Sequence, residues 1–218
     1  MKAVIMTGAS AERLDAILCR RKKPCLTSLV STIHKLGADE ALITGQKNFQ
    51  SRFSDWHEKE RGRFSTPVTL RFHDGFASSG EMDPLFRLIL HEGLEAPVLL
   101  VFLNDGTPED LEGFKNTIHL YPYSPLVGVR KPNQKPARGA VSMGERNRIT
   151  RFRSTGERLE NEWEPAGTYY FPERFLSDGF PAFIRHASDS APAFEAFLSW
   201  SVRNFKIYAH VFAAHPGL

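Results

Sequence analysis

The stretch of this sequence that most constrains its fold is the apolar run at residues 97–103, which reads PVLLVFL. An apolar run without alternating polar residues is typical of a parallel strand that is covered on both faces. Such a strand requires a layer of helices on each side of a mostly parallel sheet. The run therefore predicts an α/β protein.

The first 45 residues contain the beginning of that sheet. Residues 2–6 form a short apolar run, residues 28–36 carry apolar side chains at helical spacing, and residues 40–44 form a second apolar run. Strand, loop, helix and strand in this order predict a βαβ unit with parallel strands. We expect further strands at residues 67–72, 126–129 and 206–212, and helices at 49–64, 82–94 and 191–205.

One more helix is expected after the central strand. Thr107 is followed by Pro108, Glu109 and Asp110. Threonine at the N-cap, proline at the first helical position and acids in the first turn are typical of a helix start. The sequence therefore predicts a helix capped by Thr107.

From Lys131 onward the sequence favours short β segments. Residues 140–152 alternate around a turn at 144–147, which predicts a hairpin, and residues 168–171 are β-prone. Residues 132–139 have a linker-like composition. We expect a Rossmann-like, mixed but mostly parallel sheet flanked by helices, with a β-rich C-terminal half. One domain of residues 1–218 would then have two halves, 1–131 and 132–218.

Composition excludes several classes of function. The 218 residues are 41% hydrophobic, which suits one folded domain, and the net charge of +3 is too small to indicate nucleic-acid binding. The only cysteines, Cys19 and Cys25, supply no disulfide framework. No apolar stretch is long enough for a membrane span, and the N-terminus lacks a signal-peptide pattern. We expect a cytoplasmic protein with no membrane partner, and homo-oligomerisation stays open.

Small residues and two cations follow the first predicted strand. An apolar strand that runs into a small-residue loop is how α/β proteins place backbone N–H groups against phosphate. Arg13 and Lys23 stand where they could bind that anion. In the alternative interpretation, Arg13 pairs with Glu12 or Asp15 on a surface turn, and Lys23 belongs to a solvated patch of four consecutive cations. The small residues are Gly8, Ala9, Ser10 and Ala11.

With its elements in this order, the chain resembles the sugar-phosphate nucleotidyltransferases. Those enzymes couple a nucleoside triphosphate to a sugar 1-phosphate and release pyrophosphate. The resemblance extends almost to the C-terminus, and six segments carry it in the right order. They are residues 6–14 with Lys23-Pro24, then 78–80, 102–105, 138–141, 148–152 and 166–171.

The resemblance implies a role for each matched residue. Arg13 would hold the triphosphate, Lys23 would stabilise the transition state or grip the sugar phosphate, and Asp105 would ligate Mg²⁺. The substrates would be an NTP and a sugar 1-phosphate. Asp105 could instead be a turn residue, and Ser79 with Gly80 could cap a helix. The implied nucleotide-binding residues are Gly8, Ala9, Ser10, Ala11, Ser79 and Gly80, and the implied sugar-binding residues are Gly139 and Gly167.

The sequence also departs from the family pattern. Ala9 and Ala11 stand at two glycine positions, and Glu12 replaces a small hydroxyl residue beside the triphosphate. The lysine expected after residues 149–152 is missing, and no acid follows the last strand, where the family has a second Mg²⁺ carboxylate.

These departures leave three hypotheses. The first is a divergent nucleotidyltransferase. The second is a catalytically impaired relative that binds nucleotide or nucleotide-sugar, or acts as a partner subunit. The third is a glycosyltransferase of the related fold. It would need an Asp-x-Asp metal motif, which Asp105-Gly106-Thr107 does not provide.

Overall fold

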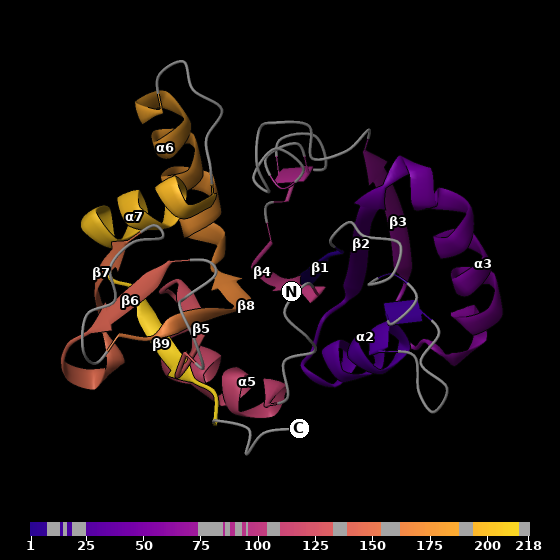
Figure 1. Ribbon diagram of the computed structural model, residues 1–218, viewed down its shortest axis with the longest axis horizontal. Coiled ribbons are helices and arrows are strands. Elements are labelled where there is room, and N and C mark those ends of the chain that lie inside the picture. Colours follow the sequence, from indigo (N-terminus) through magenta and orange to yellow (C-terminus); the bar gives the residue numbers. More distant parts are fainter. Residues whose placement is uncertain are drawn as a thin grey trace.

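A computed structural model describes residues 1–7, 14, 17–18, 25–73, 85, 88–89, 93–94, 96–103, 110–132, 139–153, 162–187 and 194–213. Within these residues a seven-stranded sheet has the order β3-β2-β1-β4-β8-β5-β9, and a two-stranded sheet pairs β6 with β7 (Figure 1). The strands are β1 (Lys2–Met6), β2 (Glu40–Gln46), β3 (Val68–His73), β4 (Val98–Phe102), β5 (Leu126–Arg130), β6 (Ala140–Met143), β7 (Ile149–Arg153), β8 (Glu164–Phe171) and β9 (Tyr208–Val211). The α-helices are α2 (Cys25–Lys35), α3 (Gln50–Glu60), α5 (Leu111–Leu120), α6 (Phe180–His186) and α7 (Phe194–Asn204).

The main sheet is mostly parallel, as predicted. β1 pairs in parallel with β2 on one side and with β4 on the other, and β3 pairs in parallel with β2. β8 enters antiparallel between β4 and β5, and β9 runs parallel to β5 at the far edge. The Rossmann-like α/β fold expected from the sequence is therefore confirmed. Its sheet also takes up two strands from the part of the chain after residue 132.

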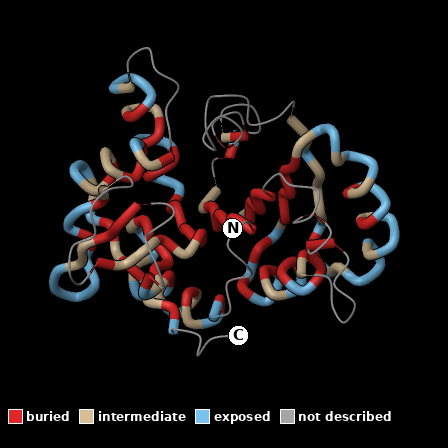
Figure 2. The backbone as a smooth tube through the Cα atoms, viewed as in Figure 1, coloured by how far each residue is buried: buried red, intermediate tan, exposed pale blue. Residues whose placement is uncertain are grey.

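The central strands are buried on both faces, which confirms the expectation from the apolar run. Along β1, Val4 and Met6 pack into one core while Ala3 and Ile5 pack into the other. β4 alternates in the same way, and all five of its residues are buried. Figure 2 shows these strands as the buried centre of the molecule. Helices α6 and α7 contribute to the first core, whereas α2, α3 and α5 contribute to the second.

The predicted cap of α5 was wrong. Asp110, not Thr107, is the N-cap, because its Oδ1 accepts a hydrogen bond from the Gly113 N–H at 2.8 Å. The backbone of Asp110 is non-helical (φ −111°, ψ 60°), so the helix cannot begin before it. Thr107 and Asp110 are both acceptable cap residues, and the local sequence alone does not distinguish between them.

The C-terminal half contains a helical segment that the sequence analysis missed. A π-helical turn (Phe175–Gly179) continues into α6, and both pack beside α7 at the end of the molecule opposite α3 (Figure 1). The predicted hairpin is confirmed: β6 and β7 pair across a turn in which Arg146 and Asn147 have positive φ of 53° and 57°. Aromatic rings fill the core at this end. The ring of Phe197 contacts those of Phe171, Phe175, Phe180, Phe183 and Phe194.

Candidate functional site

The order of the strands reverses at β1, and this places a switch point between β1 and β4. β2 and β3 lie on one side of β1, while β4 lies on the other. Met6 at the end of β1 is level with Thr44 of β2 and with Phe102 of β4. In open α/β sheets, ligands bind beyond the carboxyl ends of the strands at such a point. The candidate site is therefore the edge where β1 and β4 end side by side.

Thr7 fixes the direction in which the chain leaves β1. Its N–H and its Oγ1 hydroxyl both donate to the carbonyl of Thr44, at 3.1 and 2.8 Å, and the residue is 2% exposed. Thr7 also approaches Gly45 of β2 so closely that a Cβ there would lie 3.1 Å from the threonine oxygen. The last described residue before Gly8 is thus held rigidly against β2. Its counterpart on β4 is Leu103, which is buried and immediately precedes Asn104-Asp105.

Most of the predicted site residues lie outside the described part of the chain. The switch point brings together the end of β1, which precedes Gly8, and the end of β4, which precedes Asp105. The positions of the site side chains themselves stay predictions. The residues concerned are Arg13, Lys23, Asp105, Gly8, Ala9, Ser10, Ala11, Ser79 and Gly80.

The two predicted sugar-side glycines are described, and both have backbone conformations that favour glycine. Gly139 has a φ of +88°, and a side chain there would collide with the carbonyl oxygen of Arg153 on β7. Gly167 has a φ of +76° and lies in an irregular part of β8, opposite the register shift in β5 between Val127 and Val129. Each glycine therefore has a structural requirement, and sugar binding by either one stays a prediction.

A buried ion pair lies next to Gly139, and the sequence analysis missed it. Arg153 Nη2 donates to both carboxylate oxygens of Glu162 at 2.7 Å, and Arg153 Nε donates to Oε1 at 3.1 Å. The side chain of Glu162 is 2% exposed and that of Arg153 is 23% exposed. A bidentate guanidinium–carboxylate pair has a fixed geometry. The pair therefore fixes the end of β7 against the start of β8.

Two further cations lie along the start of β8. Arg130 Nε donates to Glu164 at 2.6 Å, and Lys131 Nζ lies 4.1 Å above the ring of Trp163. The residues of each pair are more than 30 positions apart in the sequence, so no helical or strand periodicity predicts either contact. The only available signal was that each cation directly follows a predicted strand: Arg130 and Lys131 follow residues 126–129, and Arg153 follows residues 140–152.

The end of β9 is apolar where the resemblance implies a second Mg²⁺ carboxylate. The ring of Phe212 covers Gly128 of β5 and stacks on Phe114 of α5, with ring centroids 6.0 Å apart and an interplanar angle of 14°. Across the described ranges, no group of three or more histidine, cysteine, aspartate or glutamate side chains could hold a metal ion. Asp105 is the carboxylate closest in sequence to the end of β4. One protein carboxylate with substrate phosphates is an arrangement that Mg²⁺ accepts, and Mg²⁺ binding by Asp105 stays a prediction.

The side chain of His210 connects β9 to helix α5. Its Nδ1 lies 2.8 Å from the hydroxyl of Thr117, and its Nε2 lies 3.9 Å from Asp110 Oδ2. Nε2 is buried and has no hydrogen-bond partner among the described residues. Burial lowers the pKa of His210 below its usual 6.5, and the charge of Asp110 opposes this shift only in part.

The lowered pKa of His210 predicts a pH-dependent stability. A histidine whose pKa is depressed by folding contributes stability above its unfolded pKa of 6.5, and that contribution is lost as the pH falls through the lower folded value. We expect the free energy of unfolding to decrease below pH 6.5, and this decrease to be smaller in His210→Gln. Urea unfolding at several pH values from 7.5 to 5 measures both. Equal slopes in the two proteins would contradict the assignment.

Comparison with known proteins supports the architecture. No protein-family model and no curated protein sequence matches this chain. Among solved structures, a protein of Bacillus anthracis assigned as a glucose-1-phosphate thymidylyltransferase, in complex with sucrose, superimposes with a TM-score of 0.75. The match covers 97% of this chain and 87% of the other, at 12% sequence identity. This likeness shows the fold. At that identity it does not extend to the reaction.

No helix in the described ranges is long and apolar enough to cross a membrane.

Proposed function

We propose that this protein is a divergent nucleotidyltransferase that transfers a nucleoside monophosphate from an NTP to a sugar or sugar-like 1-phosphate and releases pyrophosphate. One observation carries the proposal: β1 and β4 end side by side at the switch point. The two strands lead directly into Gly8 and into Asn104-Asp105. The segments that the resemblance assigns to phosphate and to metal therefore start from adjacent strand ends.

The proposed roles follow from the charge that develops in the reaction. Nucleotidyl transfer is an in-line displacement at the α-phosphorus, and the protein contributes positioning and electrostatic stabilisation. Arg13 would bind the triphosphate and Lys23 would neutralise the phosphoryl oxygens, while Gly8 allows close approach of the backbone. Asp105 would hold Mg²⁺, whose chemistry is to neutralise the phosphates when bound.

The sugar side would be formed by Gly139 and Gly167. Positive φ at both positions turns backbone N–H and C=O groups away from the regular ladder, where they could bind sugar hydroxyls. The Arg153–Glu162 pair would hold this backbone in place, because Ala140, the residue after Gly139, pairs with Arg153. We propose that both halves act as one domain in the cytoplasm, with no nucleic-acid partner.

A second candidate function is favoured by Phe212. Phe212, the residue that follows β9, packs its ring on Gly128 and supplies no metal ligand, so among the described residues the end of β9 contributes no second carboxylate. A catalytically impaired protein that binds nucleotide or nucleotide-sugar, or serves as a partner subunit, would require only the phosphate loop and the sugar side. Binding without turnover is the result that this alternative predicts.

A coupled assay for pyrophosphate separates the two candidates. The full-length protein is incubated with Mg²⁺, each of the common NTPs in turn, and a panel of sugar 1-phosphates. Pyrophosphate release that depends on both substrates supports the enzyme. Calorimetry with the same NTPs and Mg²⁺ is run in parallel. Binding with no turnover for any substrate pair, in a protein with a cooperative unfolding transition, would overturn the enzymatic proposal in favour of the impaired relative.

A further inference from the structure

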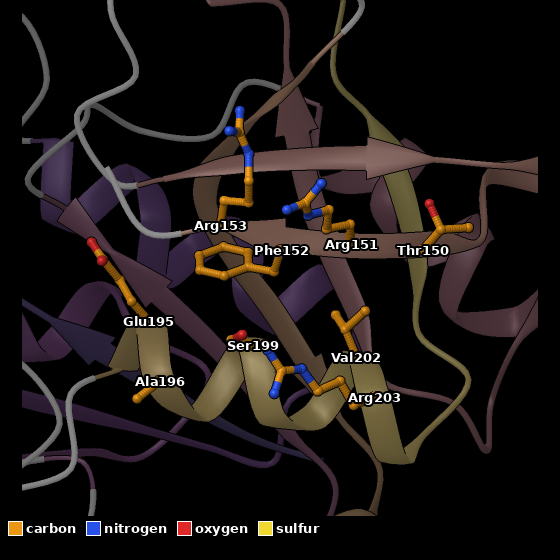
Figure 3. Close-up of a pocket in the computed structure, with 9 residues that line it drawn as sticks. All are labelled: Thr150, Arg151, Phe152, Arg153, Glu195, Ala196, Ser199, Val202 and Arg203. Carbon is orange, nitrogen blue, oxygen red and sulfur yellow. The ribbon is translucent and has the colours of Figure 1, made fainter. Parts of the chain in front are cut away.

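A groove of about 700 Å³ runs between β7 and α7, away from the switch point. Figure 3 shows Arg151 and Arg153 of β7 along one wall, with Glu195 and Arg203 of α7 along the other. Its volume is within the range of small-molecule sites. The groove is lined by Thr150, Arg151, Phe152, Arg153, Glu195, Ala196, Ser199, Val202 and Arg203.

Two of the three arginines in the groove are available for a ligand. The guanidinium of Arg153 is already bound by Glu162. Arg151 and Arg203 are both exposed, and neither has an ion-pair partner within 4.0 Å in the described part of the chain. They come from two different elements that enclose the same groove. Guanidinium groups supply several N–H donors in a fixed plane, which suits phosphate oxygens.

The other residues that line the groove indicate which further groups a ligand should carry. The Ser199 hydroxyl and the Glu195 carboxylate, both on α7, can bind hydroxyl groups, whereas Phe152, Ala196 and Val202 provide apolar surface. A carboxylate repels phosphate, so Glu195 favours an uncharged hydroxylated part near it. Ser199 lies between Glu195 and Arg203 on α7, one helical turn from each (Figure 3). The groove therefore suits a molecule with a phosphate near Arg203 and hydroxyl groups toward Glu195.

Helix α7 packs against β7, because Phe152 of β7 lies in the same core cluster as Phe197 and Leu198 of α7. The groove is therefore bounded by two packed elements, and its volume suits a small molecule.

We propose that the β7–α7 groove binds a small phosphorylated, hydroxylated molecule, with its phosphate held by Arg151 and Arg203. The groove lies apart from the edge where β1 and β4 end (Figure 1), although Arg153 lines it and also packs against Gly139 of the proposed sugar side. Arg151 and Arg203 have no role in the proposed transfer reaction, so their variants test this site alone. An effector or a second metabolite could occupy it while the switch-point site is also filled.

Calorimetry with glucose 6-phosphate tests the proposal. This sugar has no phosphate at its anomeric carbon, so it cannot serve as an acceptor in the proposed transfer, and unphosphorylated glucose is the matched neutral probe. We expect glucose 6-phosphate to bind at least about tenfold more tightly than glucose. Arg151→Gln and Arg203→Gln should each weaken glucose 6-phosphate binding by about tenfold or more, because each removes charge-assisted hydrogen bonds.

Arg185→Gln is the matched control, because Arg185 is an exposed arginine on helix α6 that does not line the groove. It should leave the affinity for glucose 6-phosphate unchanged. Thermal unfolding of every variant verifies that the fold is retained. The proposal is overturned if wild-type protein binds glucose and glucose 6-phosphate equally or binds neither. It is also overturned if the double variant Arg151→Gln/Arg203→Gln retains wild-type affinity, or if Arg185→Gln weakens binding as much as the groove variants do.

Discussion

An Asp105→Asn variant is expected to release pyrophosphate about a thousandfold more slowly than the wild-type protein at saturating NTP, sugar 1-phosphate and Mg²⁺. The substitution keeps the shape of the side chain but removes its negative charge. Asp105 is the proposed protein ligand of Mg²⁺, and the described end of β9, where Phe212 stacks on Phe114, has no carboxylate that could compensate. Loss of the metal's charge stabilisation is worth several kcal/mol, and about 4 kcal/mol corresponds to this factor.

Asp110→Asn is the matched control for this prediction. Asp110 lies five residues further along the same connection and caps α5 through the Gly113 N–H. Asparagine is an equally good N-cap residue, so this variant should keep wild-type turnover. If Mg²⁺ above the concentration that saturates the wild-type protein partly restores the rate of Asp105→Asn, the loss acts through the metal. Wild-type turnover in Asp105→Asn would remove Asp105 from the site.

The fold was predictable where the sequence of a single strand indicates whether one or both of its faces are buried. The run at residues 97–103 has no polar residue, and its side chains do alternate between two cores. A short antiparallel strand is harder to place from sequence. β8 was expected only at residues 168–171, because Pro165 and Gly167 interrupt its first half. Its insertion between β4 and β5 depends on pairing with strands about 40 to 70 residues away.

The missed π-helical turn and α6 have a related cause. Residues 175–186 contain Gly179 and Pro181, and such residues normally indicate a loop. In the structure, Pro181 lies in the first turn of α6, directly after the π-helical turn. A π-turn already interrupts the regular i→i−4 hydrogen bonds, so the missing N–H of proline is accommodated there. Gly179 gives the ring of Phe205 room to pack, since a Cβ there would lie 2.9 Å from it. Tertiary packing therefore overrides the local signal.

The candidate site was predictable only in part for a physical reason. Parallel strands have their carboxyl ends at one edge of the sheet, so sequence order alone brings the segments after β1 and β4 together. By contrast, Arg153 and Glu162 are 9 residues apart, and no helical or strand periodicity connects them. The same holds for Arg151 and Arg203, which come from β7 and α7 and meet only through tertiary structure.

Glu162→Gln is expected to lower the free energy of unfolding by about 2–3 kcal/mol. Removing one partner of a fully buried ion pair costs about 3–5 kcal/mol, because the remaining charge stays buried without compensation. The cost here should be smaller because Arg153 keeps 23% of its side-chain exposure. Glutamine retains one acceptor oxygen for Arg153 and adds no bulk. In thermal unfolding the midpoint should fall by about 5–10 °C for a chain of this length.

Glu164→Gln makes the same chemical change two residues away and isolates the effect of burial. Glu164 also pairs with an arginine, but the side chains of Glu164 and Arg130 are 13% and 40% exposed. Solvent screens such a pair, so its loss should cost about 1 kcal/mol or less. If both variants unfold at the same urea concentration, the Arg153–Glu162 pair does not stabilise the fold. If Glu162→Gln alone is destabilised and also loses affinity for sugar 1-phosphate, the Arg153–Glu162 pair supports the backbone at Gly139. The pairing of Ala140, the next residue, with Arg153 implies such a role.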